Sequence, residues 1–186
     1  MRAVCRAVAL GLIVGLLVAS PAAPLASQNG DQVEPDVEFI PTPQTIVDAM
    51  LELAHVTASD VVYDLGSGDG RIVITAARRY GARGVGVEID PLLVERATAN
   101  AEAAGVADRV RFIAGNVFDA DVSDATVVTL YLLQSLNERL RPKLVRELPP
   151  GARIVSHVFS MGPEWPPQES MTIEGHPVFL WTIDRR

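Results

Sequence analysis

A carboxylate followed by three alternating glycines is the stretch of this 186-residue chain that is best suited to chemistry. Val61–Tyr63 is a short apolar, β-branched run that ends at Asp64, and Gly66, Gly68 and Gly70 follow it. Glycine allows positive φ angles and lets backbone come close to a ligand. A strand, a glycine turn and a helix form the first crossover of nucleotide-binding α/β sheets. The pattern therefore predicts a ligand site at this turn.

The glycine spacing argues against NAD or FAD, because Arg71 stands where the dinucleotide fingerprint has its third glycine. Residues 61–70, VVYDLGSGDG, instead resemble motif I of the class I S-adenosylmethionine (SAM)-dependent methyltransferases. This resemblance implies SAM as the cofactor, and a carboxylate at the strand end suits its cationic ammonium and sulfonium. An ordinary strand end with a turn is the alternative. The cofactor-binding residues implied at this turn are Asp64, Gly66, Ser67, Gly68 and Gly70.

A second carboxylate, Glu88, lies near the end of the next predicted strand, Gly84–Asp90. A carboxylate at this position can accept hydrogen bonds from both hydroxyls of a ribose, in a bidentate and charge-assisted arrangement. Asp90 is the competing candidate, but it is better placed to cap the helix that Pro91 opens. We therefore expect Glu88 to hold the ribose.

Asn116 and Val117 follow the third predicted strand, Val110–Ala114. The methyltransferase resemblance implies a hydrogen bond from the adenine amine at Asn116, and the carbonyl oxygen of an asparagine can accept it. Val117 or Phe118 is expected to pack on the adenine face. A simple Gly-Asn turn is the alternative interpretation of this stretch.

Two aromatic side chains are candidates for the methyl-acceptor end of the site. Tyr131 lies in TLYLL, where the resemblance places substrate-facing residues, so it lines an acceptor channel or packs against a helix. His157, near the end of the fifth predicted strand, is a candidate general base, and a buried histidine with satisfied hydrogen bonds is the alternative. The Asn-Pro-Pro-aromatic motif of many amino-methyltransferases is missing from TLYLL, which argues against DNA-base and glutamine acceptors of that type.

Strands and helices alternate in the elements that must position these residues. Helices are predicted over residues 46–54, 71–80, 91–104 and 135–146, with Pro142 as a kink or a break in the last. Further strands are predicted at residues 126–132, 153–159, 169–173 and 178–183. The order predicts an α/β fold with a Rossmann-like open sheet, mostly parallel, with an antiparallel C-terminal hairpin strand. The methyltransferase resemblance implies the same seven-strand sheet.

The first residues differ in composition from the rest. Arg2 and Arg6 precede an apolar or small run over residues 7–19 that is short for a membrane span, and residues 20–27 are small and proline-rich. This layout predicts a signal peptide over residues 1–27 and an exported or periplasmic protein; membrane anchoring through residues 7–19 is the alternative. Residues 28–38 are predicted to be a polar linker, and residues 39–186 the catalytic domain.

Charge and cysteine content limit the partners. The formal net charge of −7 argues against a general nucleic-acid binder, which normally has a basic face. The single cysteine, Cys5, lies in the leader, and no Cys/His cluster predicts a metal site. Nothing in the sequence indicates an oligomeric state.

Three segments carry a narrower resemblance. FIPTP (residues 39–43), DLGSGDGRIVI (64–74) and GVEID (86–90) are similar to the small protein-lysine methyltransferases related to the ATP synthase c-subunit lysine methyltransferase. This implies a protein lysine as the methyl acceptor and a contact from Thr42 to the methionine end of SAM. A small-molecule O- or N-methyltransferase, and an exported SAM-binding protein without transfer activity, are the alternatives.

Overall fold

One mixed sheet organises the part of the chain that the structure describes, residues 39–184 of a computed structural model. The predicted leader and linker, residues 1–27 and 28–38, lie outside the described residues. The sheet has seven strands in the order β3-β2-β1-β4-β5-β7-β6. The strands are β1 (Val61–Leu65), β2 (Arg83–Glu88), β3 (Val110–Ala114), β4 (Val127–Leu130), β5 (Arg153–His157), β6 (Glu169–Ile173) and β7 (His176–Thr182).

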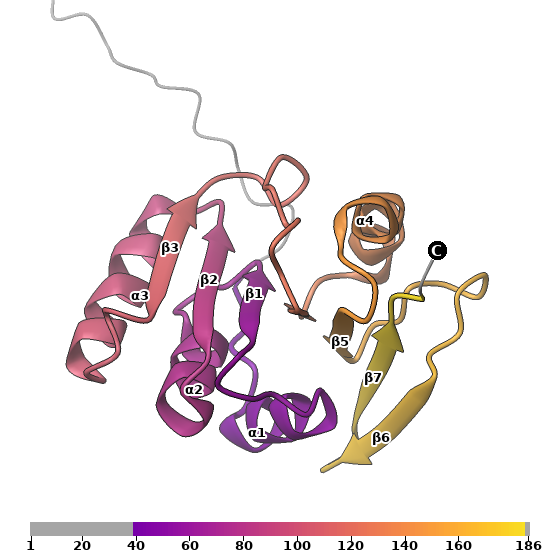
Figure 1. Cartoon of the computed structure of the whole chain (residues 1–186), viewed down its shortest axis with the longest axis horizontal. Helices are drawn as coiled ribbons and strands as arrows, with labels where there is room; N and C mark the ends of the chain where they lie inside the picture. Colours follow the sequence, from indigo (N-terminus) through magenta and orange to yellow (C-terminus); the bar gives the residue numbers. More distant parts are fainter. Residues whose placement is uncertain (1–38, 185–186) are drawn as a thin grey trace, which may run out of the picture. The chain divides into compact units, whose positions relative to one another are not determined.

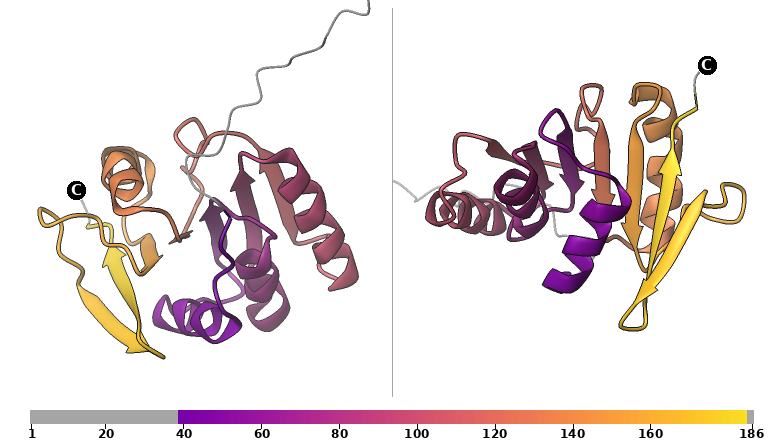
Figure 2. Two further views of the ribbon diagram at one scale, coloured as in Figure 1. Left: turned by 180° about the vertical axis from the view of Figure 1, so that it is seen from behind. Right: turned by 60° about the horizontal axis from the view of Figure 1, so that its bottom comes forward.

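Strands β1 to β5 run parallel to one another, as their alternation with helices predicts. Strand β7 is antiparallel to both β5 and β6, so the last two strands form a hairpin at one end of the sheet (Figure 2). The turn of this hairpin contains Gly175 with a φ of +82°. The predicted mostly parallel sheet with an antiparallel C-terminal hairpin is therefore confirmed.

Helices cover both faces of the sheet (Figure 1). Helices α1 (Gln44–Leu53), α2 (Arg71–Tyr80) and α3 (Pro91–Ala103) pack on one face, and α4 (Gln134–Glu147) packs on the other. Successive strand residues point to opposite faces. Because both faces are covered, β1 is buried at every position, and its sequence is accordingly an apolar run rather than an alternating one.

The order of the strands reverses on the two sides of β1. The chain continues from β1 to β2 and β3 in one direction, and then returns to β4 on the other side of β1. Open α/β sheets bind ligands in the crevice beyond the carboxyl ends of the strands at such a switch point. The glycine turn after β1 lies at this edge, where the sequence predicts the site.

The structure shortens three predicted strands. Strand β2 ends at Glu88 and not at Asp90, which caps α3. Strand β4 ends at Leu130, because its neighbour β1 ends at Leu65, so Tyr131 lies beyond the sheet. Strand β5 ends at His157, because Val158 adopts a φ of +66°, which is rare for a β-branched residue.

Helix α4 continues through Pro142, so of the two predicted outcomes, a kink or a break, the break is wrong. Leu136, Leu140 and Leu144 recur at helical spacing on its buried face, and this packing holds the helix against the sheet. No helix within residues 39–184 is both long and apolar enough to cross a membrane.

Candidate active site

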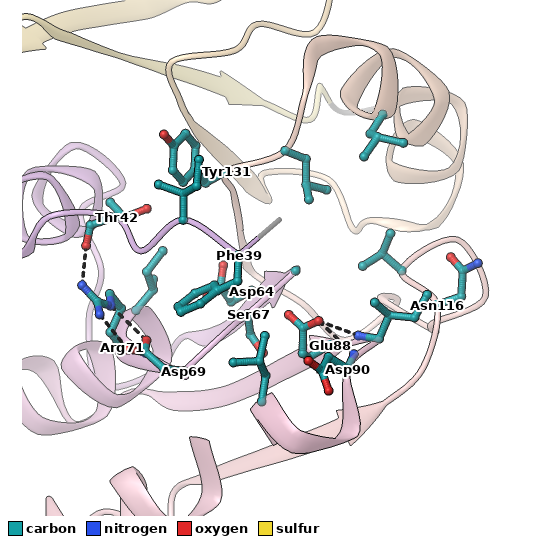
Figure 3. Close-up of a pocket in the computed structure, with 18 of the residues that line it drawn as sticks. Phe39, Thr42, Asp64, Ser67, Asp69, Arg71, Glu88, Asp90, Asn116 and Tyr131 are labelled. Carbon is teal, nitrogen blue, oxygen red and sulfur yellow. Dashed lines mark hydrogen bonds and ion pairs between the residues drawn. The ribbon is translucent and has the colours of Figure 1, made fainter. Parts of the chain in front are cut away.

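A cavity of about 300 Å³ opens at the carboxyl ends of β1, β2 and β4 (Figure 3). Its volume is at the lower end of the range for small-molecule sites. The residues that line it come from the segment before α1, the glycine turn, the end of β2, the loop after β3 and the segment after β4. The predicted cofactor-binding residues in this lining are Thr42, Asp64, Gly66, Ser67, Glu88, Asn116 and Val117.

Gly68 and Gly70, the other two predicted cofactor-binding residues, stand behind the cavity wall and shape it. Both have positive φ angles, +52° and +80°. A Cβ on Gly68 would collide with the ring of Phe39, and a Cβ on Gly70 would come within 2.5 Å of the ring of Phe112. These glycines therefore let Phe39 and β3 pack closely against the turn.

Asp64 is a buried carboxylate at the floor of the cavity. Its side chain is 3% exposed, and its Oδ1 accepts a hydrogen bond of 2.8 Å from the hydroxyl of Thr129. Burial raises the pKa of Asp64 to about 7, with a further contribution from the nearby charges of Glu88 and Asp69. Within residues 39–184, no Lys or Arg side chain forms an ion pair with it. The site thus offers a place for a cationic group of a ligand.

Glu88 is held in position by backbone N–H groups. Its Oε2 accepts from the N–H of Gly68 at 2.8 Å, and its Oε1 accepts from Ile89 at 2.8 Å and Asp90 at 3.1 Å. A carboxylate has about four acceptor directions, so these bonds leave about one, on Oε2, for a ligand hydroxyl. Two ribose hydroxyls can both bind only if a backbone bond lengthens. Asp90 also lines the cavity, and it caps α3 through the N–H of Leu92, as predicted.

Ser67 adds a polar group that has no partner within the described chain. Its side chain is 5% exposed, and its hydroxyl makes no hydrogen bond to residues 39–184. Buried polar groups are normally satisfied, because an unpaired one costs free energy. Since Ser67 lines the cavity, a polar ligand atom there would satisfy it.

Arg71 ties the segment before α1 to the glycine turn. Its guanidinium binds Asp69 through two hydrogen bonds of 2.6 and 2.9 Å, and it donates to the carbonyl of Thr42 at 2.9 Å (Figure 3). Although burial acts to raise the pKa of Asp69, the bonds and charge of Arg71 lower it below its ordinary value. The sequence indicates only that Arg71 excludes a dinucleotide and does not reveal this structural role. Its place directly after the glycines was the available signal.

The loop after β3 forms the wall beside Glu88. The side chain of Asn116 is exposed, and its Oδ1 accepts from the N–H of Phe118 at 3.0 Å, so the side chain stabilises a turn. A second lone pair of this oxygen remains for a ligand donor. Val117 and Phe118 line the cavity, and the guanidinium of Arg139 lies 4.2 Å from the centre of the Phe118 ring.

The two predicted acceptor-side residues lie next to each other, but only one lines the cavity. Tyr131 is in the lining, and its ring centre is 4.1 Å from that of His157. His157 is buried behind it, and its Nδ1 and Nε2 lie 3.4 Å from Thr42 Oγ1 and 3.2 Å from His176 Nδ1. Burial, together with the nearby His176, lowers the pKa of His157 to about 4. His157 therefore does not reach the cavity to contact a ligand directly.

Several apolar residues of the lining were not predicted from the sequence. They include Phe39 and Ile40 from the segment before α1, Leu132 from the segment after β4 and Leu136 from α4. Their positions in the sequence near Thr42 and Tyr131 were a signal. However, the spacing of apolar residues in a sequence does not distinguish those that line a cavity from those that pack in the core.

The residues present fit SAM. A buried carboxylate without a cationic partner suits the methionine ammonium, and the unpartnered hydroxyl of Ser67 suits a polar atom of the same ligand. Glu88 and the apolar loop after β3 suit a ribose and an adenine. Among the described residues, no group of His, Cys, Asp and Glu side chains is arranged to hold a metal ion.

Comparison with known proteins leads to the same class. Residues 64–169 match the ANTKMT methyltransferase domain family. A protein-lysine N-methyltransferase of Saccharolobus islandicus is 47% identical over 154 residues, which cover 80% of this chain and 95% of that protein. An ATP synthase c-subunit lysine N-methyltransferase of Xenopus laevis is 32% identical over 95% of this chain and 76% of its own length.

Solved structures agree on the fold and on the cofactor. An RNA methyltransferase from Salinibacter ruber, in complex with S-adenosyl-L-homocysteine, is 59% identical and has a TM-score of 0.77. The match covers 79% of this chain and 95% of that one. A SAM-dependent methyltransferase from Thiobacillus denitrificans, also with S-adenosyl-L-homocysteine, is 29% identical with a TM-score of 0.53, over 62% of this chain and 48% of that one. This chain belongs to the ANTKMT methyltransferase domain family of SAM-dependent methyltransferases, and SAM is its cofactor.

Proposed function

We propose that this methyltransferase acts on the side-chain nitrogen of a lysine in a protein. The observation that carries the proposal is the 47% identity, over 95% of its length, to a protein that is itself a protein-lysine N-methyltransferase. The Xenopus laevis relative, an ATP synthase c-subunit lysine N-methyltransferase, supports the same acceptor class. The resemblance of FIPTP, DLGSGDGRIVI and GVEID to small protein-lysine methyltransferases is consistent with both.

The cofactor-binding roles follow from chemistry at each position. We assign the methionine ammonium to Asp64, because a cation compensates the cost of ionising that buried carboxylate. A ribose hydroxyl is assigned to Oε2 of Glu88, and the adenine amine to Oδ1 of Asn116. We assign the backbone around Thr42 to the methionine end of SAM, because Arg71 holds the Thr42 carbonyl beside the glycine turn.

The chain's contribution to transfer is alignment and desolvation. SAM supplies a methyl group that is already electrophilic, because it is bonded to a cationic sulfur. The protein must then hold a neutral amine in line with this group and exclude water. Tyr131, Phe39 and Leu132 contribute apolar surface to the lining of the cavity. Such surroundings disfavour an ammonium and lower the pKa of a lysine that enters.

RNA is the second candidate acceptor, because the Salinibacter ruber neighbour is described as an RNA methyltransferase. The charge of the cavity disfavours it. Its lining contains four carboxylates, Asp64, Asp69, Glu88 and Asp90, and the one described cation in the lining, Arg71, is paired with Asp69. RNA phosphates would meet this negative field, whereas a lysine would be attracted by it.

A transfer assay decides between these acceptors. The full chain is incubated with methyl-labelled SAM and one of three acceptors: a lysine-rich protein, the same protein with its lysines acetylated, or total RNA. We expect label in the first acceptor alone, and mass spectrometry should place the added methyl groups on lysine. Label in RNA, or equal label in the acetylated protein, would overturn the proposal. A small amine is added as a fourth acceptor, and label in it in preference to the other three would favour a small-molecule methyltransferase.

We also propose that residues 1–27 export the protein, with a membrane anchor over residues 7–19 as the alternative. The support is the order of positive, apolar and small residues in the sequence. Cell fractionation of the tagged full chain, with the mass of its N-terminal peptide, tests this. A full-length protein in the cytoplasmic fraction would contradict both versions.

A further inference from the structure

Thr42, His157 and His176 form a row of hydrogen-bonding side chains that leads away from the cavity. The Oγ1 of Thr42, in the cavity lining, is 3.4 Å from Nδ1 of His157. The Nε2 of His157 is 3.2 Å from Nδ1 of His176. Exposure increases at the far end, because Thr42 is 4% exposed and His157 fully buried, whereas His176 is half-buried at the start of β7. The row thus connects the methyl-acceptor end of the cavity with the surface.

Each member of this row can accept a proton on one side and donate one on the other. A threonine hydroxyl does both, and a neutral imidazole has one N–H and one lone pair. One assignment connects the whole row: the Thr42 hydroxyl donates to His157 Nδ1, and the Nε2–H of His157 donates to His176 Nδ1. In this assignment His176, which is half-buried, carries its own proton on Nε2, and Oγ1 of Thr42 can accept from a group in the cavity.

The reaction requires such a path if the acceptor is an amine. A lysine is an ammonium at neutral pH, with an ordinary pKa near about 10.4, so it must lose a proton before its nitrogen can attack. Tyr131, Phe39 and Leu132 contribute apolar surface to the cavity, so little water is available there to accept a proton. A proton released in this place needs polar groups that lead it out.

We propose that Thr42, His157 and His176 carry the proton of the acceptor ammonium from the cavity to the surface. The proposal rests on the amine acceptor proposed above. The ammonium gives one proton to Thr42, whose own hydroxyl proton passes to His157 Nδ1. His157 passes its Nε2 proton to His176 Nδ1, and His176 releases its Nε2 proton to water. Each group gains and loses one proton. The freed nitrogen lone pair forms the new N–C bond, while the S–C bond breaks and its electron pair stays on sulfur.

The electrostatics of His157 suit a transfer group rather than a final acceptor. Its lowered pKa keeps the ring neutral near pH 7, so it has a lone pair available and does not retain a proton. The titratable groups that face it are His176 from β7 and Tyr131 from the segment after β4. The nearby carboxylate of Glu174, in the β6–β7 turn, instead accepts a hydrogen bond from the hydroxyl of Thr45 in α1. Among residues 39–184, no carboxylate hydrogen-bonds either ring.

The first test compares His176→Asn with His55→Asn in methylation of the lysine-rich protein. His55 is an exposed histidine at the end of α1, and the positive φ of 49° that it adopts is one that asparagine tolerates. We expect His176→Asn to lower kcat by about 100-fold or more at pH 7, the usual range for lost proton transfer. The deficit should shrink above pH ~10.4, the ordinary lysine pKa, where most free lysine has already lost its proton. His55→Asn should match the wild type throughout.

A merely structural role for His176 predicts a different pattern. It would lower kcat equally at all pH values, or raise KM and weaken SAM binding. We expect the SAM Kd of His176→Asn, measured by calorimetry, to be unchanged. Added imidazole should restore part of the kcat of His176→Ala, because it can replace the missing proton acceptor. A pH-independent loss without rescue by imidazole would overturn the proposal.

The second test needs no turnover. In the assigned row, ¹⁵N NMR of the apo protein should show His157 as the neutral Nε2–H tautomer, with Nδ1 accepting a hydrogen bond. Thr42→Val should change the Nδ1 shift and leave Nε2 nearly unchanged. The opposite tautomer, with the proton on Nδ1, would break the direction of transfer and overturn the proposal.

These tests separate the relay from the proposed function. If the wild type methylates lysine and His176→Asn equals it at every pH, the relay is wrong and the lysine acceptor stands. If the wild type methylates no amine, the proposed function fails, and the relay fails with it, whatever tautomer the NMR experiment finds.

Discussion

The hydroxyl of Thr129 donates a hydrogen bond of 2.8 Å to Asp64, from the paired position on the neighbouring parallel strand. This bond favours the ionised carboxylate, but burial acts more strongly in the other direction and raises the pKa to about 7. The buried Asp64 therefore lowers the stability of the fold when it is ionised, and we assign it to the cationic methionine ammonium of SAM. Both the stability of the apo protein and its affinity for SAM should depend on this carboxyl group.

Asp64→Asn should stabilise the apo protein and weaken SAM binding. A carboxyl group whose pKa rises on folding contributes its full stability below its unfolded pKa near about 3.8, and this contribution is lost as pH rises through about 7. A neutral amide avoids that loss and still accepts from Thr129. Urea unfolding at pH 8 should show a gain on the order of 2–4 kcal/mol that vanishes near pH 4. Equal stabilities of the two proteins at pH 8 would contradict the prediction.

SAM binding should release a proton at pH 6. The apo protein holds Asp64 largely protonated at that pH, whereas the methionine ammonium requires the ionised form, so binding expels the proton. SAM affinity should therefore rise with pH up to about 7 and then level off. Calorimetric titrations in two buffers with different ionisation enthalpies measure the released proton. The Asp64→Asn protein is the control, and an identical release from it would exclude Asp64 as the source.

Glu88→Ala should weaken SAM binding by roughly 1.5–3 kcal/mol, because a charged acceptor for a ribose hydroxyl is lost. The neighbouring carboxylate provides the matched control. Asp90→Ala removes the cap of α3, at about 1 kcal/mol of folding stability, but should leave SAM affinity nearly unchanged. Calorimetry gives both affinities, and unchanged binding by Glu88→Ala would exclude the ribose role.

Gly70→Ala should destabilise the fold although its side chain would not enter the cavity. The new Cβ would lie 2.5 Å from the Phe112 ring and 3.0 Å from Cβ of Ala97, at a backbone φ of +80°. Strain and overpacking together should cost about 2–4 kcal/mol in denaturant unfolding.

Gly105→Ala is the control for this strain. It has a similar φ of +70° and open space around the new Cβ, so it should cost only about 1 kcal/mol. Equal losses in the two variants would indicate that backbone conformation alone, and not packing against α3 and β3, requires Gly70.

Much of the site was predictable because its signals are local. The apolar run of β1, the glycines after it and the helix periodicity of α2 lie within 20 consecutive residues, Val61–Tyr80, and each reflects a backbone preference. Glu88 was predictable for the same reason, since it ends the next strand. Tyr131 was placed within a strand that in fact ends at Leu130, because strand length depends on the neighbouring strand.

Other features could not be predicted from spacing. Glu88 accepts from Gly68, 20 positions earlier, so its lone pairs are partly used before any ligand arrives. The Arg71 guanidinium binds both Asp69 and the carbonyl of Thr42. The bond to Thr42 depends on how the segment before α1 packs against the glycine turn. Each is a contact between separate segments, and its geometry exists only when both are packed.

The sequence by itself determined the fold class, because alternating strands and helices are patterns of neighbouring residues, and the resemblance of its glycine turn to methyltransferase motif I implied the cofactor. Only the tertiary structure decided how the acceptor end is arranged. Thr42 and His157 are 115 positions apart in the chain, yet their side chains lie within hydrogen-bonding distance next to Tyr131. His176, from the β6–β7 hairpin, lies within hydrogen-bonding distance of His157. Burial of Thr42 and His157, which lowers the pKa of His157, arises from packing of α1 and β7 against β5 and has no counterpart in local sequence.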